Sequence, residues 1–279
     1  MLPLRHFLLA VQFFSRIPVT GRLAAWAGWS PERQRASAAH LPGVGWLVGL
    51  WGGCGLLAGA WLLAPSAWMP LAAALLSTLA TLWLTGGLHE DGLADVADGL
   101  GGMAAPERAL EIMKDSRLGA YGAMALVMAL LTKTTLLAAL IAAGPLRAAV
   151  VLCCVHVLSR LAPLLLMRSL PYVGQAATSK AAHLAGRPLS GKGLATGLLW
   201  CLPALALLWQ LPDAPSATAA LSLMAALLLA GTLATAAMAG WLRRRLGGMT
   251  GDCLGAAQQT CELAMLLAAA ALMVRWPGP

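Results

Sequence analysis

The sequence predicts an all-α fold, a polytopic transmembrane helical bundle of about seven spans with an amphipathic helix at its N-terminus. Hydrophobic residues make up 59% of the 279-residue chain, and charged residues only 11%. Several runs of about twenty residues carry almost no charge, and a helix of that length crosses a bilayer core. The charges that remain collect between these runs, as they do in membrane proteins.

Each apolar run is expected to form one helix of a single integral membrane domain, residues 1–279. The runs are rich in Gly and Ala, which favours close packing between helices and is compatible with a homo-oligomer. The seven predicted spans are Leu41–Ala64, Ala67–Gly87, Gly119–Ala143, Leu146–Met167, Gly193–Leu211, Ala217–Leu242 and Ala256–Val274.

Residues 1–35 are predicted to form an N-terminal cytoplasmic or interfacial segment. Five apolar residues fall on one helical stripe, which is typical of an amphipathic helix lying at the inner membrane surface. A short first span or a re-entrant segment is the alternative. A secretory signal peptide is not expected, because the apolar run is only about ten residues long and no small-residue cleavage site follows it. The stripe consists of Leu4, Phe7, Leu8, Val11 and Phe14.

The basic residues predict the orientation. With the N-terminus in the cytoplasm, 15 of the 19 Lys and Arg residues fall on the inner side, as the positive-inside rule requires. The net charge of +8 then reflects topology and attraction to anionic membrane lipid, and no nucleic-acid partner is expected. The inner basic residues are Arg5, Arg16, Arg22, Arg33, Arg35, Arg108, Lys114, Arg117, Arg168, Lys180, Arg187, Lys192, Arg243, Arg244 and Arg245.

An acidic stretch follows the second span. Seven of the eleven carboxylates lie between Glu90 and Asp115, and residues 88–118 are predicted to be a cytoplasmic active-site segment. Asp91, Asp95 and Asp98 are spaced i, i+4, i+7, which places all three on one face of a helix. Such a face repels itself unless a positive group lies against it. The remaining members of the stretch are Glu107 and Glu111.

Magnesium is the cation that this face is predicted to bind. Mg²⁺ takes oxygen ligands from few protein carboxylates and completes its coordination with water and substrate phosphate. Small residues between the acids are expected to admit a pyrophosphate close to the helix backbone. The alternative is a solvated acidic face paired with nearby basic residues, but charge is scarce in this chain and acids at the end of a span are usually functional. The small residues are Gly92, Ala94, Ala97 and Gly99.

Several strings together resemble one family. TGGLHEDGLADVADGL, followed by ERALEIMKDSRLGAYG, is similar to the signature of the cobalamin synthase family, the adenosylcobinamide-GDP ribazoletransferases. VQFFSRIPV, LPGVGWLVG, Ser159-Arg160 and GGMTGDCLGA agree with it in the same order along nearly the whole chain.

The resemblance implies a reaction and its partners. Such enzymes join α-ribazole, or its 5′-phosphate, to adenosylcobinamide-GDP, which gives adenosylcobalamin or its phosphate and releases GMP. An alcohol attacks a pyrophosphate in this reaction, and Mg²⁺ is the expected cofactor. A bacterial inner membrane is the expected location, with the active site facing the cytoplasm.

Roles can then be predicted for individual acids. Asp91, Asp95 and Asp98 are expected to bind Mg²⁺, with Asp115 as a further ligand, and one of the aspartates on the helix is expected to accept the proton of the attacking hydroxyl. Asp252 is a plausible second contact with metal or substrate. His89, beside the acidic face, is a candidate base, although a lone histidine at a membrane interface is more often structural.

Four cations are candidates for binding the pyrophosphate: Lys114, Arg117, Lys133 and Arg160. For Lys133, a structural ion pair within the bundle is an equal alternative. The basic run Arg243–Arg245 follows a span and is interpreted as a topology signal. The chain has Gln258 and Gln259 where an acid is expected ahead of Glu262, which weakens the case for a metal contact there.

Two other functions share parts of this pattern. A CDP-alcohol phosphotransferase of lipid synthesis would use the same metal chemistry, and Asp95-x-x-Asp98-Gly99 resembles the opening of its signature, but the later carboxylate pair is missing. A cation-coupled transporter would also place acids in a membrane bundle. Its acids would be expected near the midplane, whereas these cluster at one surface.

Overall fold

The computed structural model describes residues 2–174 and 180–276. These residues form helices, and the described part contains no β-strand, only a single bridge between Tyr172 and Met249. The helices are α1 (Leu2–Phe14), α2 (Gly21–Ala27), α3 (Pro31–Ser37), the 3-10 helix η1 (Ala38–His40), α4 (Leu41–Leu63), α5 (Met69–Thr85), α6 (Leu88–Gly101), α7 (Pro106–Ile112), α8 (Ala120–Ala143), α9 (Pro145–Leu158), α10 (Leu161–Ser169), α11 (Lys180–Ala185), α12 (Gly191–Trp209), α13 (Ala217–Leu246) and α14 (Gly251–Met273).

The predicted multi-pass membrane bundle is confirmed. Within residues 2–174 and 180–276, six helical segments are long and apolar enough to cross a membrane, and α5 together with α6 makes a seventh, bent candidate. Some predicted boundaries are wrong: the last span starts at Gly251 rather than Ala256, and the sixth ends at Leu246 rather than Leu242. The fourth span passes through a turn at Ser159–Arg160 between α9 and α10.

Small residues bring the long helices together. Helix α4 packs between α5 and α9, and α14 packs against α13, α8 and α6. At Gly49 of α4, a side-chain carbon would lie 2.7 Å from the Cα of Cys153 in α9, so only glycine permits this approach. Such contacts suit a membrane, where van der Waals packing rather than the hydrophobic effect holds helices together.

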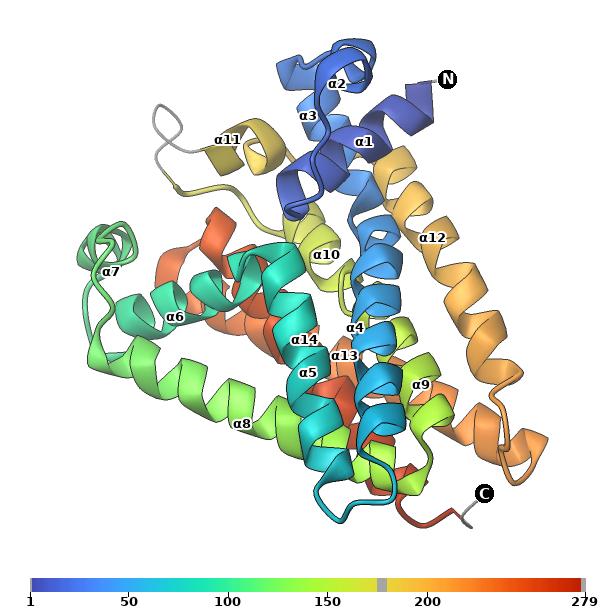
Figure 1. Ribbon diagram of the computed structural model, residues 1–279. Helices are drawn as coiled ribbons and strands as arrows, with labels where there is room; N and C mark the ends of the chain where they lie inside the picture. The colour runs from blue at the N-terminus through green and yellow to red at the C-terminus, as the bar shows by residue number, and fades with distance from the viewer. Residues whose placement is uncertain (1, 175–179, 277–279) are drawn as a thin grey trace.

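Helix α1 contains 13 residues, which is too short to cross a bilayer core. It buries Leu9, Val11 and Phe14 and packs against α3 and α4. This arrangement favours the interfacial helix over a short first span. Figure 1 shows α1, α2, α3 and α11 at one end of the bundle, with the α4–α5, α8–α9 and α12–α13 connections at the other.

The acidic helix α6 turns away from the span that precedes it. Two successive glycines, Gly86 and Gly87, have φ angles of 69° and 71°, a backbone region that residues with a side chain rarely adopt. They produce a bend of 88° between α5 and α6. The backbone N–H of Arg16 donates to the Leu84 carbonyl at 2.7 Å and ties the chain after α1 to this corner. Helix α6 therefore lies across the bundle rather than along it (Figure 1).

Candidate functional site

Four carboxylates gather where α6 meets the start of α14. Asp91 is exposed, Asp95 and Asp98 are half-buried, and Val96 and Leu100 on the other face of α6 are buried. The charges of Asp91, Asp98 and Asp252 all act on Asp95. The predicted common face of the three α6 aspartates is therefore present, and Asp252 joins it from a distant part of the sequence.

The approach of α14 to α6 depends on two glycines. A side-chain carbon at Gly92 would lie 2.7 Å from the carbonyl oxygen of Asp252. One at Gly255 would lie 3.1 Å from the carbonyl oxygen of His89. The expectation that Gly92 and Gly99 admit a pyrophosphate to the helix backbone is wrong, because both are buried against protein: Gly92 against α14, and Gly99 against α7 and the Met113 side chain.

Asp252 occupies the first turn of α14. Thr250 caps this helix, and its hydroxyl accepts from the backbone N–H of Cys253 at 3.4 Å and lies 3.2 Å from Oδ2 of Asp252. The positive end of the helix dipole favours a carboxylate at this position. A contact with metal or substrate is thus compatible with the place of Asp252, although the residue belongs to the last helix and not to the connection before it.

The carboxylate of Asp98 also accepts hydrogen bonds from the start of α8. Its Oδ2 accepts from the backbone N–H of Gly119 and its Oδ1 from that of Gly122, both at 2.8 Å. These amides belong to the start of α8, whose first N–H groups have no partner within the helix. Asp98 therefore joins α6 to α8, and its role as a metal ligand stays a prediction.

Asp115 does not join the other acids. Its carboxylate accepts from Arg117, with 2.9 Å from Nε to Oδ1 and 2.5 Å from Nη2 to Oδ2. These hydrogen bonds lower the pKa of Asp115 to about 2, and the same pair raises the pKa of Arg117. Both side chains are exposed to solvent, at 38% for Asp115 and 87% for Arg117, so the pair is screened and free to exchange partners.

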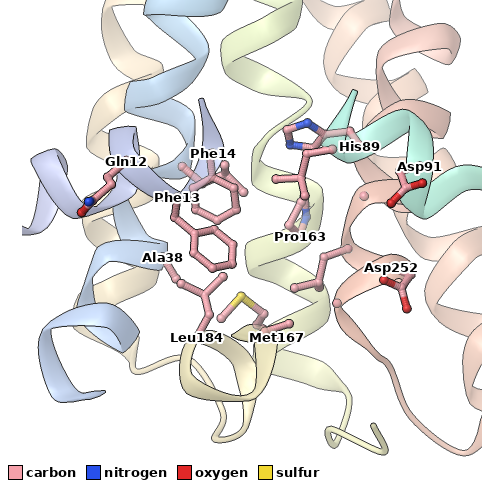
Figure 2. Close-up of a pocket in the computed structure, with 16 residues that line it drawn as sticks. Gln12, Phe13, Phe14, Ala38, His89, Asp91, Pro163, Met167, Leu184 and Asp252 are labelled. Atoms are coloured by element: carbon pink, nitrogen blue, oxygen red, sulfur yellow. The ribbon is translucent and has the colours of Figure 1, made fainter. Parts of the chain in front are cut away.

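An open pocket of about 620 Å³ lies beside the acids. We call it the acidic pocket. Figure 2 shows Asp91 and Asp252 on one side of it, with the rings of Phe13 and Phe14 on the other. The pocket thus combines negative charge with a broad apolar wall. Its remaining lining includes His89, Ala38, Pro163, Met167 and Leu184.

A second pocket of about 630 Å³ opens on the other side of Asp252. Lys114 lines it together with Tyr172, Glu107 and Glu111. Of the cations predicted to bind pyrophosphate, Lys114 is thus placed next to the acid cluster.

The donor set suits a hard divalent cation. Among the described residues, no three His, Cys, Asp or Glu side chains already converge as a preformed metal site does. Mg²⁺ does not require that, because it keeps several waters and is usually held by one or two carboxylates and the substrate phosphates. Asp91 and Asp252 face one pocket from two helices, and the glycine contact at Gly92 fixes those helices together. The residues present therefore fit Mg²⁺.

Beneath this pocket lies a buried network centred on Glu262. The Nζ of Lys133 lies 2.7 Å from its Oε1, and Nδ1 of His156 lies 3.1 Å from its Oε2. Gln258 donates to the same Oε2 at 2.7 Å, and Gln259 donates to Glu90 at 3.0 Å. The two glutamines, which stand where the family resemblance implied an acid, thus hydrogen-bond the glutamates of the network.

Lys133 and Arg160 lie in this interior, 2% and 1% exposed. The structural ion pair that was the alternative for Lys133 is present. Arg160 donates through Nη1 to the carbonyl of His156 at 2.7 Å, and its charge acts on His89. A direct contact of either cation with pyrophosphate would require the network to open. His89 is 4% exposed and lies between the network and the acidic pocket.

Arg245 has a structural role that the sequence did not indicate. Its Nη1 donates to the carbonyl of Leu100 at 3.1 Å and its Nη2 to that of Gly102 at 2.9 Å. These carbonyls lie at the C-terminal end of α6, where a cation satisfies acceptors that have no partner within the helix. A basic run after a span is indistinguishable from a topology signal until the fold is known.

Comparison with known proteins gives the family. A family model described as cobalamin-5-phosphate synthase matches residues 6–270. The chain belongs to the cobalamin-5-phosphate synthase family. Curated relatives named adenosylcobinamide-GDP ribazoletransferase include those of Albidiferax ferrireducens (51% identical, 95% of this chain, 96% of the relative), Polaromonas naphthalenivorans (50%, 95% and 96%) and Vibrio cholerae (40%, 95% and 92%).

Membership confirms the resemblance that the motifs indicated. The acids on α6 and at the start of α14 both lie inside the matched range. No solved structure matches the chain.

Proposed function

We propose that the protein is an adenosylcobinamide-GDP ribazoletransferase. It joins α-ribazole or α-ribazole 5′-phosphate to adenosylcobinamide-GDP, and GMP leaves. The observation that carries the proposal is the convergence of Asp91, Asp95 and Asp252 beside an open pocket, in a chain of the cobalamin-5-phosphate synthase family.

The reaction breaks the phosphoanhydride bond of the pyrophosphate and forms a phosphoester bond to the ribose. A ribose hydroxyl attacks the phosphorus on the cobinamide side of the pyrophosphate, the bond from that phosphorus to the bridging oxygen breaks, and GMP carries the oxygen away. The hydroxyl proton must leave as the new bond forms. We assign it to a carboxylate oxygen of Asp91, which is exposed at the acidic pocket, with His89 as the neighbouring candidate.

Mg²⁺ is part of the proposal. Asp91, Asp95 and Asp252 would hold it, and Asp98 would contribute through the oxygen lone pairs that the α8 amides leave free. The ion would neutralise pyrophosphate charge and make the attacking hydroxyl more acidic. Asp115 is not required by this arrangement.

The two pockets beside Asp252 suggest how the substrates divide. The acidic pocket has an aromatic and aliphatic wall that suits an apolar ring system such as the base of ribazole. The second pocket offers the ammonium group of Lys114 and the ring of Tyr172 to the guanosine part. Three carboxylates, Glu107, Glu111 and Asp252, also line it, so phosphate binding there would depend on Mg²⁺. Asp252 lines both and would lie at the reacting phosphorus.

The orientation is proposed from charge. Residues of α1 and α11 line the acidic pocket, and Figure 1 shows these two helices at one end of the bundle. The segments predicted to lie on this side carry 15 of the 19 Lys and Arg residues. By the positive-inside rule, we infer that the site faces the cytoplasm and that the protein lies in a bacterial inner membrane. Guanosine nucleotides are available on that side.

The test is a GMP-release assay on the full-length protein in nanodiscs, with adenosylcobinamide-GDP, α-ribazole and Mg²⁺. We expect release to depend on ribazole, to stop with excess EDTA, and to fall by at least about a hundredfold in Asp95→Asn. Asp213→Asn, which neutralises an exposed acid in the α12–α13 connection, is the matched control and should retain activity. If folded wild-type protein releases no GMP, the proposal is rejected. A CDP-linked lipid would then be the next substrate to test.

A further inference from the structure

A third pocket, about 360 Å³ in volume, opens near the acidic pocket on the other side of η1. We call it the basic pocket. Met167 lines both pockets, and Ala38 and Ala39 of η1 line one each. The basic pocket is formed by α1, α3, η1, the segment that leads into α12 and the first turns of α12. Its charged and histidine lining includes Glu32, Arg35, His40, Arg187 and Lys192.

The pocket carries an excess of positive charge. Arg35, Arg187 and Lys192 line it, and Glu32 is its one described carboxylate. The charges of Arg35 and Arg187 both act on Glu32, so the acid offsets part of the charge and leaves an excess of cations. The Nε of Arg35 is buried without a hydrogen-bond partner among the described residues. A buried guanidinium N–H without a partner is costly unless a ligand accepts from it.

A buried histidine adds a second donor. His40 is 5% exposed, and its Nδ1 accepts from the indole Nε1–H of Trp200 at 3.1 Å. Because Nδ1 is an acceptor, the neutral ring carries its proton on Nε2. No described residue accepts from that N–H. The Trp200 contact therefore holds the ring so that its remaining polar atom is a donor.

We propose that the basic pocket binds a phosphate group. Its donors are two guanidinium groups, an ammonium group and an imidazole N–H, and guanidinium groups in particular match phosphate oxygens. The phosphate belongs either to a free small molecule, the 5′-phosphate of α-ribazole 5′-phosphate, or to the headgroup of an anionic phospholipid. Only the first source rests on the proposed function. The shared Met167 makes the pocket a neighbour of the acidic pocket in either case.

Arg187 and Lys192 are exposed, so both can be replaced without disturbing the core. The test variant is Arg187→Gln/Lys192→Gln. The matched control is Arg22→Gln/Arg244→Gln, which removes two exposed arginines outside the pocket. Glu32→Gln removes the opposing charge and should strengthen phosphate binding. All are studied as full-length protein in nanodiscs, and the readouts do not require turnover.

The first measurement is equilibrium binding of α-ribazole 5′-phosphate and of α-ribazole by calorimetry. If the phosphate comes from the free molecule, the test variant weakens binding of the phosphorylated form about tenfold or more relative to α-ribazole, and Glu32→Gln tightens it. The control variant leaves both affinities unchanged. This result would hold even if no GMP were released, which separates it from failure of the proposed function.

The second measurement is native mass spectrometry of protein released from bilayers of phosphatidylcholine and phosphatidylglycerol. If the phosphate belongs to a lipid headgroup, wild type and control retain bound phosphatidylglycerol and the test variant loses it, while ribazole affinities do not change. If neither the phosphorylated ligand nor the lipid distinguishes the test variant from the control, the proposal is overturned.

Discussion

Gly92 in α6 packs against the backbone of Asp252 in α14, so closely that a side-chain carbon at position 92 would lie 2.7 Å from the Asp252 carbonyl oxygen. The contact joins residues 160 positions apart in the sequence and places an acid of the last helix beside those of α6. Distances between the carboxylates thus depend on the absence of one methyl group.

Gly92→Ala tests this relationship. The added methyl group must push α14 from α6 by several tenths of an ångström, which moves Asp252 relative to Asp91. Because a small misplacement of catalytic groups can be costly, we expect kcat/KM for GMP release to fall about ten- to a hundredfold. Gly102→Ala is the control, since a side chain there meets nothing within 4 Å and its φ of −85° is ordinary. Equal activity of the two variants would show that the contact does not position the site.

The membrane bundle and the α6 aspartates could be predicted because both are periodic features of the sequence. Length and apolarity define a span, and the spacing of Asp91, Asp95 and Asp98 defines a helical face. The partner of that face could not be predicted in the same way. Asp252 is a lone acid in the sequence, and only the packing of α14 on α6 brings it close.

Asp115 and Arg160 were predicted to contact metal or substrate, but the structure gives both of them protein partners. Proximity in sequence made Asp115 a candidate ligand, but its neighbour Arg117 takes its carboxylate. Arg160 is a cation within a span and must have partners there, and the structure supplies them from His156 of the same helical segment. A sequence shows that a buried charge needs a partner but not whether protein or substrate provides it.

Asp98→Asn separates structural from catalytic aspartates. An Asn side chain offers one carbonyl oxygen for the two amides of Gly119 and Gly122, and its NH₂ group would oppose the other. We expect a loss of about 1–3 kcal/mol in the free energy of unfolding, seen as a lower melting temperature in detergent. Asp91→Asn should leave the melting temperature unchanged or slightly higher, because it relieves repulsion, while it lowers activity. If both variants melt like wild type, the bond from Asp98 to α8 does not stabilise the fold.

Arg245→Gln should loosen the end of the acidic helix. The substitution removes the guanidinium that donates to the carbonyls of Leu100 and Gly102. We expect faster amide hydrogen exchange in residues 96–104 and a several-fold lower kcat, because α6 carries the site. Arg244→Gln is the matched control, an exposed neighbour in the same basic run. If amide hydrogen exchange is identical in the two variants, Arg245 does not stabilise the end of α6 and acts only as a topology signal.

Glu262→Gln should be the most destabilising of these changes. It leaves the ammonium of Lys133 buried without the carboxylate 2.7 Å away, and removing one partner of a buried ion pair costs about 3–5 kcal/mol. The double variant Lys133→Met/Glu262→Met removes both charges and should recover part of the lost melting temperature, because the ammonium of Lys133 is then no longer buried without its carboxylate. It should also keep measurable GMP release if the pair is structural. A double variant that folds like wild type but is inactive would instead mean that the buried charges take part in the reaction.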